Sequence, residues 1–197
     1  YVAELVAVAL LSLALDRVRD TSAAEVLAPV PAAIDAALAA EPAVERSAHR
    51  LASMSECIVL GRGFEYPTAR EWALKLKEVA RVFADPYSAA DFEHGPITLV
   101  GPGTSVLAVA TTGPALAGVG ALLATLSERG ARLLVASDDG DVRGIGADAI
   151  VLPTGIPEWL APISSIVPAQ LFAYHLALAR GVDPERPVNL HKVTLTR

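Results

Sequence analysis

The sequence contains very little sulfur. Its 197 residues include one cysteine, Cys57, and one methionine. A single cysteine excludes an internal disulfide and favours a protein of the reducing cytosol. Because Cys57 opens the apolar run 57–60, we interpret it as a small core residue and not as a nucleophile.

Aromatic and charged residues are also scarce, at 5% and 19% of the chain, whereas hydrophobic residues make up 53%. This balance excludes a disordered chain and predicts one domain with a sizeable core. The net charge of -6 argues against general binding to nucleic acid or to acidic membranes, which requires clustered Lys and Arg. A small anionic ligand needs only a few local hydrogen-bond donors, so the net charge does not exclude binding of such a ligand.

Three motifs that would identify a chemistry are missing. Gly61-Arg62-Gly63 follows an apolar run, but residue 66 is Tyr, so GxGxxG is absent and a dinucleotide site is disfavoured. The four histidines form no HExxH or similar pattern, and GxSxG is absent as well. We therefore expect no metal ion, no cofactor and no serine nucleophile.

Long hydrophobic runs are missing too. The apolar stretch 5–15 is too short to span a bilayer, and no basic segment precedes it. We therefore expect neither a membrane span nor a signal peptide. Residue 1 is Tyr and the first predicted helix has no cap, so we expect the sequence to begin inside a helix of a longer parent protein.

The pattern of the chain changes near residue 55. The helices predicted before this point cover residues 2–19, 22–40 and 43–54. The strands predicted after it are the apolar runs 57–60, 106–110, 132–136 and 149–152, and the helices between and after them are 68–82, 114–129 and 163–179. Short apolar strands alternating with helices predict an α/β fold, a three-layer doubly wound parallel sheet preceded by a helical segment.

Ionisable residues gather on one face of the predicted helix 68–82. At 100° per residue, Glu71, Lys75 and Glu78 lie within about 60° of one another. A solvated face with ion pairs worth about 0.3–0.5 kcal/mol each explains this spacing as well as a site does. His94-Gly95-Pro96 follows in the next loop, and a histidine beside such a face could serve acid/base catalysis.

Two further segments could contribute to a site. Thr111-Thr112-Gly113 precedes a predicted helix, a position that can bind phosphate. Few hydroxyls follow it, so we interpret it as a structural turn. In the polar tail, His191 and Lys192 lie where apolar and polar residues alternate, which predicts an ordered tail.

Five stretches together resemble the SIS (sugar isomerase) domain family. They are residues 61–67, 71–78, 94–96, 167–181 and 187–194. The chain is similar to the second SIS subdomain in the isomerase part of glutamine–fructose-6-phosphate aminotransferase (glucosamine-6-phosphate synthase), and to stand-alone phosphosugar isomerase/deaminase relatives. The resemblance implies a flavodoxin-like fold. It also implies that residues 1–54 end a preceding SIS subdomain and form a bridge, that 55–181 are the second subdomain, and that 182–197 are a tail closing on the site.

The resemblance also implies roles for individual residues. Glu78 corresponds to the base that moves a proton between C1 and C2 of the open-chain sugar, with Lys75 and Glu71 in the same site. His94 corresponds to a ring-opening histidine that reaches the site of a neighbouring subunit. Lys192 corresponds to a lysine on the closing tail that contacts the sugar. His191, also expected to bind substrate, stands where a small residue is common.

The expected activity is that of a phosphosugar aldose–ketose isomerase or amino-sugar-phosphate deaminase, acting on hexose 6-phosphates such as fructose or glucosamine 6-phosphate. We expect a cytoplasmic homodimer that binds neither nucleic acid nor a membrane. Two alternatives stay open. The chain could belong to a glutamine-dependent glucosamine-6-phosphate synthase, or it could be a non-catalytic sugar-phosphate sensor. In this family the loop that grips the phosphate belongs to the first subdomain, which this sequence does not contain.

Overall fold

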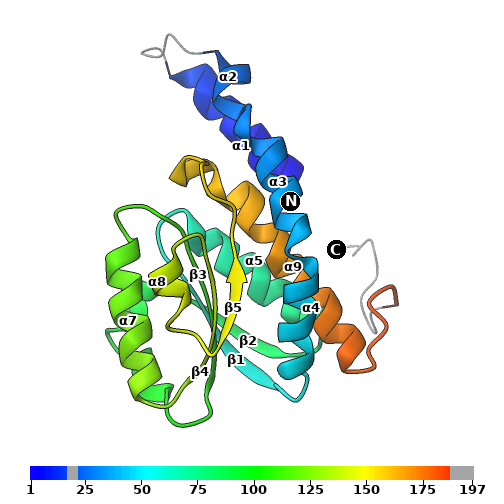
Figure 1. Cartoon of the computed structure of the whole chain (residues 1–197), viewed down its shortest axis with the longest axis vertical. Helices are drawn as coiled ribbons and strands as arrows, with labels where there is room; N and C mark the ends of the chain where they lie inside the picture. Colours follow the sequence, from blue (N-terminus) through cyan, green and yellow to red (C-terminus); the bar gives the residue numbers. More distant parts are fainter. Residues whose placement is uncertain (17–21, 187–197) are drawn as a thin grey trace, which may run out of the picture.

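A five-stranded parallel sheet forms the centre of the chain (Figure 1). The computed structural model describes residues 1–16 and 22–186. The strand order is β2-β1-β3-β4-β5, and the strands are β1 Glu56–Gly61, β2 Phe83–Ser88, β3 Ser105–Ala110, β4 Arg132–Ser137 and β5 Asp148–Val151. The chain reverses direction across the sheet between β1 and β3, which is the topological switch point of a doubly wound fold. The predicted fold class is confirmed.

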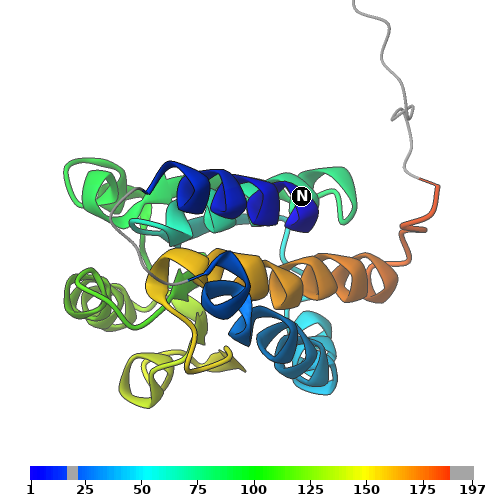
Figure 2. The same ribbon diagram turned by 90° about the horizontal axis from the view of Figure 1, so that it is seen from above.

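Helices cover both faces of the sheet, as the view from above shows (Figure 2). One face packs against α4 Glu41–Arg50, α5 Glu65–Glu78 and α9 Ala161–Ala179. The other packs against α6 Ala89–Phe92, α7 Leu116–Glu128 and α8 Gly140–Arg143, with the short η1 Pro96–Leu99 beside them. Strands β1, β3 and β4 are buried on both sides, which explains why they read as continuous apolar runs.

Most of the described residues before β1 are helical, and none of them forms a strand. They form α1 Val2–Leu15, α2 Ala23–Leu27, α3 Pro29–Ala39 and α4. Ala9 and Val30 from these helices pack with Leu160 and Ile163, which lie in η2 Glu158–Leu160 and at the start of α9. The first three helices extend beyond the carboxyl edge of the sheet (Figure 1).

Helix α9 is the structural centre of this bundle. It contacts α1, α3, α4 and α5, and 14 of its 19 residues are buried. The segment Glu158–Ala179 is apolar and long enough to cross a membrane, with a mean hydropathy of 1.2, but 83% of that window is buried inside the domain. Its composition is therefore explained by its place in the core.

Two sequence expectations were wrong near residue 80. Helix α5 ends at Glu78 and not at residue 82, because Arg81 adopts a left-handed conformation (φ 55°). The chain then forms β2, a strand that the sequence did not predict. Asp85 and Pro86 interrupt any apolar run, but β2 lies at the edge of the sheet, where a proline need not donate to a further strand.

Candidate functional site

One face of α5 carries three interacting ionisable side chains. Lys75 Nζ lies 2.6 Å from Glu78 Oε2 and 3.7 Å from Glu71 Oε1. The side chains of Glu71, Lys75 and Glu78 are 12%, 30% and 28% exposed, so they are partly shielded from solvent. The opposite face of the helix packs into the core through Ala69, Trp72, Ala73 and Leu76.

The charges on this face do not cancel, because one ammonium stands between two carboxylates. Partial burial acts to lower the pKa of Lys75, but the hydrogen bond to Glu78 and the charge of Glu71 outweigh it and raise that pKa. Lys75 is therefore held as a cation. A carboxylate beside a fixed cation can accept a proton while the cation stabilises a developing oxyanion.

Tyr1 is a neighbour of this face that sequence reasoning missed. Its phenol donates a hydrogen bond to the carbonyl oxygen of Pro67 at 3.4 Å. Burial, followed by the charges of Glu71 and Glu65, raises the pKa of Tyr1. No local pattern could have indicated this contact, because it joins residues 66 positions apart.

The other predicted site residues are not brought to this face. His94 is exposed, and its backbone N–H donates to the carbonyl oxygen of Asp91 at 3.2 Å. It follows α6, which packs on the opposite face of the sheet from α5. Within residues 1–16 and 22–186, no contact joins His94 to Glu71, Lys75 or Glu78. His191 and Lys192 lie outside the described residues.

A buried carboxyl group, Glu65, lies at the switch point between β1 and β3, and sequence reasoning missed it too. Glu65 is 2% exposed. Ser165 Oγ lies 3.0 Å from its Oε1 and 2.8 Å from its Oε2, and Thr111 Oγ1 lies 3.3 Å from Oε1. Desolvation is the main cause that raises its pKa. The signal available in the sequence was its place just after Gly61-Arg62-Gly63.

The loop after β3 uses its polar groups within the chain. Besides the Thr111 contact to Glu65, the N–H of Thr112 donates to Asp138 Oδ1 at 2.8 Å. The Glu158 side chain packs so closely on Gly113 that a Cβ there would lie 2.4 Å from Glu158 Cδ. These contacts support the interpretation of Thr111-Thr112-Gly113 as a structural turn.

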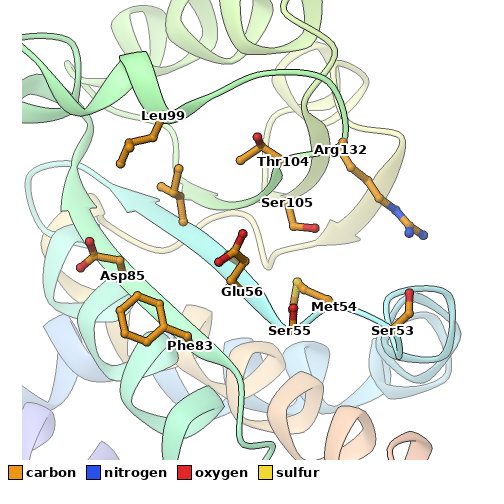
Figure 3. A pocket seen from close by; sticks show the side chains of 13 residues that line it. Ser53, Met54, Ser55, Glu56, Phe83, Asp85, Leu99, Thr104, Ser105 and Arg132 are labelled. Atoms are coloured by element: carbon orange, nitrogen blue, oxygen red, sulfur yellow. The ribbon is translucent and has the colours of Figure 1, made fainter.

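A hollow of about 460 Å³ lies at the other end of the sheet, near the amino ends of β1, β2 and β3 (Figure 3). Glu56 lies in its middle, and Arg132 points away from it (Figure 3). Asp85, also on its wall, accepts a hydrogen bond from the Tyr87 hydroxyl at 2.6 Å. None of the three α5 side chains lines this hollow, so it is separate from the candidate site.

Metal-ligating side chains do not gather in the described part of the chain. No group of three or more His, Cys, Asp or Glu residues there is arranged to hold a metal ion.

Comparison with known proteins identifies the family. The family model described as the SIS domain matches residues 50–180. The chain belongs to the SIS domain family. Among curated proteins, it is 37% identical over 201 residues to the glutamine–fructose-6-phosphate aminotransferase of Pseudomonas putida, covering 98% of this chain and 33% of that protein. A 38% identical stretch in the enzyme of Pyrococcus horikoshii covers 83% of this chain and 27% of that protein. The chain thus spans about a third or less of these relatives.

Solved structures agree with this membership. The C-terminal domain of glucosamine-fructose-6-phosphate aminotransferase from Francisella tularensis superposes with a TM-score of 0.74 at 29% identity, covering 81% of this chain and 45% of that one. Glucosamine-6-phosphate deaminase from Thermotoga maritima superposes with a TM-score of 0.67 at 24% identity, covering 98% and 56%. The second likeness concerns the fold alone.

Proposed function

We propose that this SIS domain supplies the proton-transfer half of a phosphosugar isomerase or amino-sugar-phosphate deaminase that acts on hexose 6-phosphates. The observation that carries the proposal is Lys75 held between Glu71 and Glu78 on a half-buried helix face. An ordinary solvated pair would leave such side chains largely exposed. Membership of the SIS family, and relatives named as isomerising aminotransferases, support the same chemistry.

The reaction needs one base and one fixed cation. In our proposal the Glu78 carboxylate takes a proton from C1 or C2 of the open-chain sugar and returns it to the neighbouring carbon. The Lys75 ammonium stabilises the enediolate oxygen that forms between these steps. Glu71 keeps Lys75 charged and oriented through the 3.7 Å ion pair. The tail, with His191 and Lys192, would close over the sugar and exclude water.

A second subunit would complete the site. His94 is exposed, and α6 just before it packs on the opposite face of the sheet from α5, so its side chain could project from one subunit toward another. We propose a homodimer in which His94 opens the sugar ring in the neighbouring subunit. The helical residues 1–54 would then end a preceding SIS subdomain whose loop holds the phosphate, as the bridge to the second subdomain at 55–181.

The relatives favour one alternative. Both curated proteins named above are glutamine-dependent aminotransferases, so the parent protein could be a glucosamine-6-phosphate synthase of which this chain is the isomerase part. The residues of α5 would have the same roles there. The two proposals differ in whether glutamine supplies an amino group to the sugar.

One assay separates these cases. The complete protein containing this chain is incubated with fructose 6-phosphate and with glucosamine 6-phosphate, with and without glutamine. Ammonia release from glucosamine 6-phosphate without glutamine supports the deaminase. Product formation that requires glutamine supports the synthase. Binding of both sugars with no turnover would overturn the enzymatic proposal and favour a sensor.

A further inference from the structure

Glu65 is the one acidic side chain that the described part of the chain buries at the carboxyl ends of β1 and β3. It is the first residue of α5, and its partners come from two other elements. Thr111 directly follows β3, and Ser165 lies in the second turn of α9. The carboxyl group therefore joins three elements at one point.

Within residues 1–16 and 22–186, no cation acts on this carboxyl group. Its hydrogen-bond partners are hydroxyls. The charge of Asp138 raises the pKa of Glu65, and the charge of Glu65 raises the pKa of Tyr1. Burying a carboxylate without a cation is costly, so such a group stays protonated instead. A neutral acid can donate its O–H to Ser165 and accept from Thr111, whereas a carboxylate can only accept.

Glu65 lies where α5 packs closely on both β1 and α9, so a small shift of the first turn of α5 would change both contacts. The backbone of Glu65 lies against the end of β1, since a Cβ on Gly61 would lie 2.3 Å from the Glu65 carbonyl oxygen. About two turns further along the same helix, Trp72 packs edge-on against Phe172 of α9, with ring centroids 5.6 Å apart. Glu65 and Trp72 thus fix α5 against α9 at two points, and the ionisable face is carried on the helix between and beyond them.

We infer that Glu65 is a positioning residue: as an uncharged acid it ties the first turn of α5 to β3 and α9, and so sets where Glu71, Lys75 and Glu78 stand. The inference rests on the proposed function for its catalytic consequence. The claim that Glu65 fixes the position of α5 stands apart from that function, because the position of α5 can be measured without turnover.

The test compares Glu65→Gln with Glu65→Leu in the complete protein. Gln keeps the shape and both hydrogen-bonding modes without a charge, so kcat should stay within about threefold of the parent. Leu fills the space but cannot bond the hydroxyls, so kcat should fall about tenfold or more while KM changes less than about twofold, because a misplaced catalytic face slows the reaction. If Gln is as damaging as Leu, an ionised carboxylate is needed and the inference is wrong.

Ser165→Ala and Ser164→Ala form a matched pair. Both serines are buried on α9, but Ser164 bonds the carbonyl oxygen of Ala161 in its own helix and not Glu65. Ser165→Ala should lower kcat about fivefold, the scale of one lost hydrogen bond, and Ser164→Ala should leave it unchanged. Equal effects of the two substitutions would mean that the hydrogen bond between Ser165 and Glu65 has no special role in positioning α5.

A readout without turnover separates failure of this inference from failure of the proposed function. The indole N–H resonance of Trp72 reports how α5 packs on α9. It should be unchanged in Glu65→Gln and shifted in Glu65→Leu. If the parent protein turns over no sugar phosphate but this pattern holds, the proposed function fails and the positioning role stands. An unshifted resonance in Glu65→Leu overturns the positioning role whatever the activity.

Discussion

The ammonium of Lys75 lies 2.6 Å from Oε2 of Glu78 and 3.7 Å from Oε1 of Glu71. One cation thus serves two carboxylates on successive turns of one helix, and the group keeps one net negative charge. The helix holds this geometry by itself, since residues three and four positions apart share a face. What the tertiary fold adds is partial burial, which strengthens each interaction relative to water.

Replacing Glu78 tests the proposed base. Glu78→Gln keeps the shape and removes the proton acceptor, so turnover of hexose 6-phosphate by the complete protein should fall at least about a hundredfold, the scale of general-base catalysis. Lys77→Gln is the matched control on the same helix. Lys77 is exposed, and its substitution should leave turnover within about twofold. Unchanged turnover in Glu78→Gln would refute the role of Glu78.

The pH dependence of stability tests the environment of Lys75. Because the folded pKa of Lys75 is raised above its ordinary value of 10.5, its contribution to stability is complete below about pH 10 and is lost as the pH rises through the folded pKa. The difference in unfolding free energy between the parent chain and Lys75→Met should therefore be constant from pH 7 to about pH 10 and shrink above it. Urea denaturation over this range measures it.

Lys77→Met serves as the control for this titration, because Lys77 is exposed and makes no ion pair in the described part of the chain. This variant measures any alkaline loss of stability that does not depend on the ion pairs of Lys75. A parallel decline in both variants would mean that the alkaline loss is general, and would contradict a specific cation between Glu71 and Glu78.

The sequence predicted the α5 face because both the spacing and the contacts are local. The same holds for β1, β3 and β4, whose burial on both faces leaves continuous apolar runs. Strand β5 alternates between buried and exposed residues, but its apolar composition still indicated a strand. Strand β2 was not predicted because, among the described residues, one side of it has no strand neighbour, so it tolerates Asp85 and Pro86. The other edge strand, β5, was predicted because it keeps an apolar run, so what local pattern missed is the polar composition of β2 and not edges in general.

The contacts of Glu65 and Tyr1 could not be predicted for a different reason. The Ser165 hydroxyl lies 100 positions from Glu65 in the sequence, and the Pro67 carbonyl lies 66 positions from Tyr1. A glutamate in the first turn of a helix is ordinarily an exposed residue that favours the helix dipole. Only the packing of α9 over the first turn of α5 turns this one into a buried acid.

Gly61 allows the close approach between β1 and α5. A Cβ at this position would lie 2.3 Å from the backbone oxygen of Glu65, and backbone cannot move aside cheaply. Gly61→Ala should therefore lower the unfolding free energy by about 1–3 kcal/mol, the usual cost of overpacking. Gly101→Ala is the control, because a Cβ there meets no atom within 4 Å, and it should change stability by less than about 0.5 kcal/mol. Equal effects would show that β1 and α5 have room to separate.

The thiol of Cys57 should be unreactive in the folded chain. Burial is the main cause that raises its pKa to about 12, with the charge of Glu56 adding to it. At pH 8 only about one thiol in ten thousand would be ionised at that pKa, and the thiolate is the form that reacts. Iodoacetamide should therefore modify the folded chain at least about a hundredfold more slowly than the urea-unfolded chain.

The same burial predicts a pH effect on stability with a definite sign. The folded pKa of Cys57 lies above its ordinary value of 9.0, so the unfolded thiol ionises first as the pH rises. The difference in unfolding free energy between the parent chain and Cys57→Ala should be constant below about pH 9 and decline between about pH 9 and pH 12. Denaturation at pH 7 and pH 10.5 measures this. A difference that stays constant, together with rapid alkylation of the folded chain, would mean that solvent reaches Cys57 through the hollow that it lines.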